Sequence, residues 1–124
     1  MSNAASANSH VRVFFGNLQD IPGFFNNSPQ RVEVLNNIVK KRIPLSATTR
    51  WNFNIRTINV VYENRASLIE CMHEIEEQFA NNTVCSAAAS IRRTLNDPIF
   101  NFWLTFFHHV MPHVDILFNQ LQQR

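Results

Sequence analysis

The sequence predicts an all-α, helical-bundle-like domain of about five helices. Apolar residues recur at three- and four-residue intervals along most of the 124 residues, which is the spacing of amphipathic helices, and no stretch alternates polar and apolar residues as a half-buried strand does. Hydrophobic residues make up 45% of the chain and charged residues 16%, a composition that excludes intrinsic disorder. We expect a flexible N-terminus at residues 1–8 and a helical segment over residues 9–124.

Two helices are predicted in the first third of the chain. The first covers residues 9–25, where these apolar residues follow helical spacing: Val11, Phe14, Phe15, Leu18, Ile21 and Phe25. Ser28 and Pro29 have the pattern of an N-cap followed by the first helical residue, so a second helix begins there. Pro44 is expected to end it.

Three further helices are predicted after a loop at residues 44–50. The longest covers residues 52–79, with one continuous apolar stripe, and we expect it to end at the polar run that follows. A short helix is expected over residues 85–95. The last helix is expected over residues 98–122, with a kink at Pro112.

Charge is divided along the chain, and its basic part offers a candidate nucleic-acid site. Residues 31–65 hold seven Lys or Arg against two Glu, a net of +5, whereas residues 66–78 hold four Glu and no base, a net of −4. The candidate site combines cations with a large aromatic residue, which together can hold a phosphate backbone and stack on a base: Lys40, Lys41, Arg42, Arg50 and Trp51. In the alternative interpretation, the lysines complement a helix dipole and Trp51 packs in the core.

Metal and cofactor sites are not expected. Glu70 and His73 have the Glu-x-x-His spacing of di-iron helical bundles, but such a site needs a second copy of the motif, so a solvated acidic face is favoured. Four residues near the C-terminus could act as zinc ligands: His108, His109, His113 and Asp115. Pro112 disturbs the helical face that would bring them together.

An enzyme is not expected either. The chain has two cysteines, Cys71 and Cys85, too few for a disulfide scaffold. The acidic residues around Cys71 should raise the pKa of its thiol, which is the opposite of nucleophile activation. The chain contains no Gly-rich phosphate loop. The aromatic last helix instead suggests a surface for protein association or self-association, formed by Phe100, Phe102, Trp103, Phe106 and Phe107.

Four blocks of the sequence, in order, resemble hAT-superfamily DNA transposases of the kind related to zinc finger MYM-type proteins. The resemblance runs from about Ala4 to Arg124, and the blocks are residues 14–19, 24–31, 49–52 and 112–121. It implies a segment of the helical insertion within an RNase H-like catalytic domain. It also implies that Arg50 contacts phosphate or packs locally, and that Trp51 stacks on a base displaced from the duplex.

The same resemblance implies a non-catalytic protein. The family's first two catalytic carboxylates fall before this segment and the third falls after it, and Asp20, Asp97 and Asp115 do not replace them. We therefore expect a transposon-derived fragment with weak, salt-sensitive DNA binding, located in the nucleus or alternatively in the cytoplasm. The alternatives are an association module that uses the last helix, and a relic gene product with no selected function.

Overall fold

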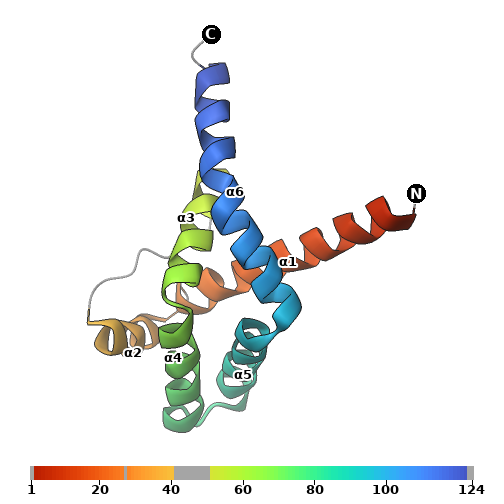
Figure 1. Cartoon of the computed structure of the whole chain (residues 1–124). Coiled ribbons are helices and arrows are strands. Elements are labelled where there is room, and N and C mark those ends of the chain that lie inside the picture. The colour runs from red at the N-terminus through yellow and green to blue at the C-terminus, as the bar shows by residue number, and fades with distance from the viewer. Residues whose placement is uncertain (1, 27, 41–50, 123–124) are drawn as a thin grey trace.

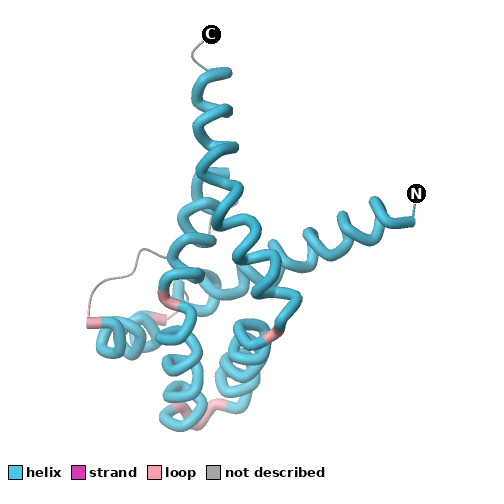
Figure 2. Tube along the Cα trace, viewed as in Figure 1, coloured by secondary structure: helices cyan, strands magenta, loops and turns pink. Residues whose placement is uncertain are grey.

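The structure, a computed structural model, describes residues 2–26, 28–40 and 51–122, and within these ranges it is helical with no strand. Figures 1 and 2 show the helices, and the described connections after residue 63 are short loops. The helices are α1 (Ser2–Asn26), α2 (Pro29–Val39), α3 (Trp51–Glu63), α4 (Arg65–Gln78), α5 (Asn82–Asn96) and α6 (Pro98–Gln122). The all-α prediction is confirmed, and the predicted number of about five helices is close to the six described.

The extra helix arises because the predicted helix over residues 52–79 is broken at Asn64 into α3 and α4. The backbone N–H of Asn64 donates to the Val60 carbonyl at 3.0 Å, and its side-chain Nδ2 donates to the same carbonyl at 2.9 Å. A short polar side chain that bonds to nearby backbone groups competes with regular helix. The prediction of one long helix was wrong for this reason.

Two predicted helix boundaries in the first third of the chain also differ from the structure. Helix α1 begins at Ser2, not at residue 9. Helix α2 ends at Val39, before Pro44 is reached, because Lys40 adopts a left-handed conformation with φ 61° and its N–H bonds to the Asn36 carbonyl at 2.7 Å. The N-cap position of Ser28 is confirmed, although its side chain makes no capping hydrogen bond.

The polar run after α4 begins the next helix. Helix α4 ends at Gln78, and Asn81 is the N-cap of α5. The Asn81 Oδ1 accepts hydrogen bonds from the N–H groups of Thr83 at 2.8 Å and Val84 at 3.2 Å, which satisfies two of the free donors at a helix start. Helix α5 therefore starts earlier than the predicted 85–95.

One apolar core joins the six helices. Helix α4 packs against α2 and α5, α3 packs along α6, and α1 contacts α2, α3, α5 and α6. Fully buried side chains come from all six helices: Leu18, Ile21, Leu35, Ile58, Leu68, Met72, Ile75, Leu95 and Leu104. Each such side chain contributes about 1.5–3 kcal/mol by leaving water.

The first part of α1 and the last part of α6 extend away from this body in Figure 1. Within the described residues, no helix is both long and apolar enough to span a membrane. The position of α6, packed on one side and open on the other, decides which surface is available for function.

Candidate functional site

The predicted nucleic-acid site falls largely outside the described residues. Lys41, Arg42 and Arg50 lie outside them, and Trp51 is the first residue of α3, with a side chain that is not described. Lys40 is exposed at the C-cap of α2. The clustering of these five residues stays a prediction.

The outward side of α6 carries an apolar stripe at three- and four-residue spacing. We call this set the outward stripe, and it consists of Ile99, Phe102, Trp103, Phe106, Val110, Val114, Leu117 and Leu121. Phe102 is 61% exposed and Leu117 58%, while Trp103 and Val110 are half-buried. Because one helical turn takes 3.6 residues, these positions share one face over a length of about 33 Å.

Two of the residues predicted for this surface face the core instead. Phe100 is buried, and Phe107 is half-buried against α1, with its ring stacked on Phe14 at a centroid distance of 5.4 Å. The Phe100 ring also lies 5.0 Å from Phe14. Phe100 and Phe107 therefore hold α6 on α1, and the prediction that they form the association surface was wrong.

The exposed rings of Phe102 and Phe106 flank Trp103, which is half-buried and packs against the core. Trp103 lies edge to face with Phe102 at 5.1 Å and with Phe106 at 5.8 Å. Val13 on α1, which is 61% exposed, shares a small hollow with Ile99 and Trp103 and extends the apolar surface onto a second helix. Contiguous apolar surface of this kind marks an interaction site in soluble proteins.

Two histidines of α6, His108 and His109, lie beside Tyr62, and their own rings are 5.3 Å apart. A hydrogen bond of 2.9 Å joins His108 Nδ1 to Asn59 Oδ1 on α3, and the Tyr62 ring stacks on His108 at 3.9 Å. His109 and His113 are exposed. Among the described residues, no three potential ligands come together in a group that could hold a metal ion. His108 therefore serves the α3–α6 contact.

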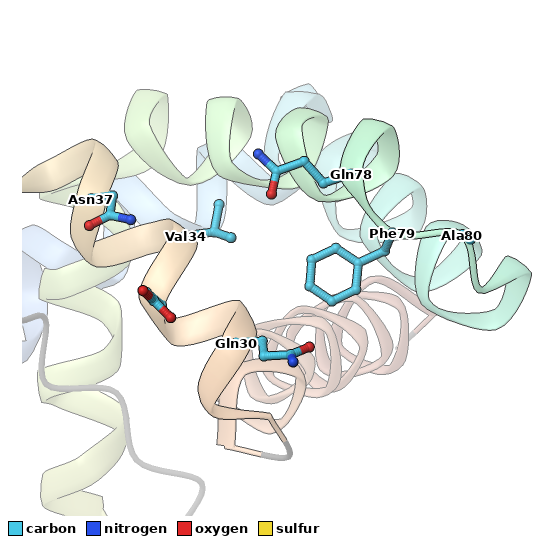
Figure 3. Close-up of a pocket in the computed structure, with 7 residues that line it drawn as sticks. Gln30, Val34, Asn37, Gln78, Phe79 and Ala80 are labelled. Carbon is cyan, nitrogen blue, oxygen red and sulfur yellow. The ribbon is translucent and has the colours of Figure 1, made fainter.

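A cavity of about 520 Å³ separates α2 from the end of α4 (Figure 3). Its lining combines three side-chain amides, one carboxylate and three apolar residues: Gln30, Glu33, Val34, Asn37, Gln78, Phe79 and Ala80. The Phe79 ring points toward α2 in Figure 3. Glu33 is the one titratable residue among these seven lining residues.

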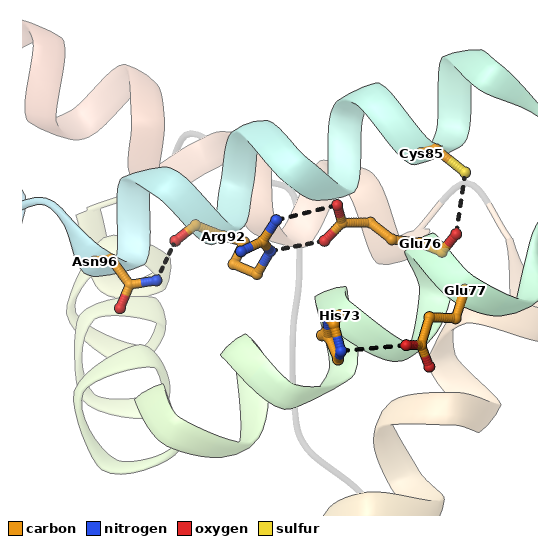
Figure 4. A network of polar contacts seen from close by, with 6 residues as sticks. All are labelled: His73, Glu76, Glu77, Cys85, Arg92 and Asn96. Carbon is orange, nitrogen blue, oxygen red and sulfur yellow. Dashed lines mark hydrogen bonds and ion pairs between the residues drawn. The ribbon is translucent and has the colours of Figure 1, made fainter.

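The acidic face of α4 is partly tied to α5 by an ion pair (Figure 4). Arg92 donates through Nε to Glu76 Oε2 at 2.7 Å and through Nη2 to Oε1 at 3.2 Å. This hydrogen bonding is the main reason that the pKa of Glu76 lies below its usual value. His73 and Glu77 lie 3.3 Å apart on the exposed side, and Glu70 is exposed too. Glu76 is therefore a structural residue.

Neither cysteine has the setting of a nucleophile. Cys71 is buried, and burial, followed by the charges of Glu74 and Glu70, raises the pKa of its thiol to about 12. The direction of this shift was predicted, and burial is its largest cause. The Cys85 thiol donates to the Phe79 carbonyl at 3.0 Å and thereby ties α5 to the α4–α5 connection.

Comparison of the chain with family models, curated proteins and solved structures finds no match. The resemblance to hAT transposases therefore stays a proposal. The function has to be inferred from the surfaces that the fold presents.

Proposed function

We propose that this chain is an association module whose outward stripe on α6 binds the same stripe of a second copy. The observation that carries the proposal is the exposure of large apolar side chains along one face of α6, with Phe102 61%, Ile99 55% and Leu121 58% exposed. A monomer would leave this apolar area in water at a cost of about 25 cal/mol per Å². Association removes that cost.

The charge of α6 favours a second copy as the partner. Between Pro98 and Gln122 the sequence holds one formally charged residue, Asp115, together with three histidines. Two such helices can pair without burying unpaired charges, whose desolvation opposes association. A strongly charged partner would gain nothing electrostatically from this face.

The geometry suits a symmetric pair. In a two-fold dimer each copy presents the same patch. A self-complementary helix face is therefore enough to form a closed dimer with no further free binding surface of this kind. The last part of α6 extends beyond the other helices in Figure 1, which leaves space for a second helix alongside it. Three exposed or half-exposed aromatic rings, Phe102, Trp103 and Phe106, would form the centre of the contact.

Sedimentation equilibrium tests this function. Wild-type protein should show a monomer–dimer equilibrium in the range of about 1–100 µM. Phe102→Asp should weaken it by roughly 30-fold or more, as expected when a central aromatic anchor is lost. Thr105→Asp places the same charge on an exposed α6 position off the stripe and should leave the equilibrium unchanged. A wild-type monomer throughout this range would refute the proposal.

A second candidate function is DNA binding by a non-catalytic, nuclear fragment that resembles a hAT transposase. It is favoured by the exposure of Lys40 at the end of α2, next in sequence to Lys41 and Arg42, and by the resemblance at Arg50 and Trp51. A site of this size would make about four phosphate contacts, so its affinity should fall steeply with salt.

Fluorescence anisotropy with duplex and hairpin DNA at two salt concentrations tests the second candidate. Replacing Lys40, Lys41, Arg42 and Arg50 by Ala should abolish binding, and Arg50→Ala with Trp51→Ala should weaken hairpin binding most. Arg12→Ala with Arg93→Ala, which removes exposed charges elsewhere, is the control. This function would be excluded if DNA binding did not depend on salt concentration. It would also be excluded if the variant with all four basic residues replaced bound DNA as well as wild type.

A further inference from the structure

His109 and His113 are two exposed imidazoles on adjacent turns of α6. Because they are four residues apart, they lie on one side of the helix, about 6 Å apart along its axis. Helix α6 is continuous from Pro98 to Gln122 with Pro112 inside it. The proline between the two histidines therefore does not end the helix that carries them.

The fold leaves the nitrogens of both rings without a bonding partner in the part of the chain that the structure describes. Neither His109 nor His113 makes a hydrogen bond or an ion pair with another described residue. His108 differs, because its Nδ1 is bonded to Asn59. The His109 ring lies edge-on to Tyr62 at a centroid distance of 6.2 Å and still remains exposed. His109 and His113 are therefore available as ligands.

Both histidines border the outward stripe. His109 comes seven residues after Phe102, and His113 comes seven residues after Phe106. Seven residues are close to two helical turns, so each histidine lies on nearly the same side of α6 as the stripe residue before it. A second copy that covers the stripe would therefore come close to both imidazoles.

The two-fold dimer proposed above brings two such pairs together if its α6 helices are antiparallel. The outward stripe extends over residues 99–121, so its midpoint, residue 110, falls between the two histidines. A two-fold axis at right angles to antiparallel helices exchanges the residues before and after that midpoint and keeps both pairs on one edge of the contact. His109 of each copy would then lie within about one turn, along the axis, of His113 of the other.

From this placement we infer that the α6 dimer binds a zinc ion between its two copies, with His109 and His113 of each copy as the four ligands. Zinc takes four nitrogen or sulfur ligands in a tetrahedron, and two histidines four residues apart on one helix face can bind one zinc ion. Within the described residues of one chain, no three potential ligands come together. The site is therefore complete only in the dimer, and the inference rests on the proposed pairing of two α6 helices.

Sedimentation equilibrium of the full chain, in EDTA and with excess zinc chloride, tests this inference. Zinc should lower the dissociation constant of the dimer about tenfold or more, because an ion that binds only the dimer stabilises it by mass action. Magnesium chloride is the matched divalent salt. It should have no effect, because Mg²⁺ prefers oxygen ligands to imidazole. Equilibrium dialysis should find one zinc ion for every two chains.

Two variants assign the effect to these ligands. His109→Gln with His113→Gln keeps polar side chains at both positions but removes the imidazoles, so the response to zinc should disappear while the equilibrium in EDTA persists. His73→Gln removes an exposed histidine from α4 and should keep the full response to zinc.

The outcomes separate this inference from the proposed function. A wild-type dimer in EDTA that zinc does not strengthen would overturn the zinc site and leave association through the outward stripe intact. A response to zinc that persists in the double variant would overturn it too. A monomer in EDTA that zinc converts to a dimer, through both histidines, would support the zinc site and refute association without metal.

Discussion

Glu76 and Arg92 form a bidentate pair that joins α4 to α5, and the pKa of Glu76 is lowered chiefly by the hydrogen bonds from Arg92. A carboxyl group with a lower pKa in the folded state stabilises the fold above its unfolded pKa, near 4.3. That contribution is lost as pH falls through the folded pKa. The pair should therefore stabilise the protein at neutral pH and not in acid.

Glu76→Gln should lower the urea midpoint at about pH 7, and the difference from wild type should vanish well below pH 4. The effect should be modest because both side chains are partly exposed. Glu70→Gln, on the exposed side of the same helix, controls for the loss of one charge. A difference that persists unchanged in acid would show that the pair does not act through ionisation.

For single residues, the sequence predicted the direction of a pKa shift but not which side chains come into contact. The acidic neighbours of Cys71 correctly indicated a raised pKa. The partner of Glu76 could not be predicted, because Arg92 comes from another helix and lies sixteen residues along the chain. The burial of Arg31 Nε without a hydrogen-bond partner could not be predicted either, because it depends on the fold placing Phe24 beside the guanidinium.

Helix starts and ends depend on single polar residues. Asn81 accepts hydrogen bonds from two N–H groups at the start of α5, whereas Asn82 is the first residue of the helix. We expect Asn81→Ala to reduce the free energy of unfolding by about 1 kcal/mol. Asn82→Ala, the matched change at the next position, should have little effect. Equal losses in urea denaturation would contradict this capping role.

The two sides of α6 should differ in their effect on stability. Phe100 packs in the core against Phe14, whereas Phe102 is 61% exposed. Phe100→Ala should cost about 3–5 kcal/mol, the usual range for a buried Phe. Phe102→Ala should be nearly neutral when measured at a protein concentration low enough to favour the monomer. Comparable losses in the free energy of unfolding at both positions would contradict the burial of Phe100 and the exposure of Phe102.

Helical spacing was sufficient to predict that these elements are helices, but not where each one ends. The break at Asn64 lies inside a continuous apolar pattern, and Lys40 ends α2 in a left-handed conformation that lysine rarely adopts. The spacing also showed that α6 is aromatic on more than one side. Which side faces the core depends on the rings that α1 supplies.

The whole molecule combines a shared core with one apolar face that the described residues leave open. Helix α1 covers the Phe100 side of α6, and α3 packs along the same helix. Among the described residues, no other helix covers the outward stripe in this way, and α6 has a single formally charged residue, so two copies of the stripe are compatible with each other. The sequence predicted an aromatic association surface in α6, but two of the residues expected there belong to the core because tertiary packing decides the exposed side.

The most direct test follows Trp103 during dilution, because Trp103 lies within the outward stripe. In a Trp51→Phe chain, Trp103 is the one remaining tryptophan. Its emission should shift to longer wavelength on dilution from about 100 µM to 0.1 µM, as dissociation exposes the ring to water. Phe102→Asp in the same chain should move this change in emission to concentrations roughly 30-fold higher or more. An emission maximum that stays constant on dilution and is unaffected by Phe102→Asp would contradict association through the outward stripe.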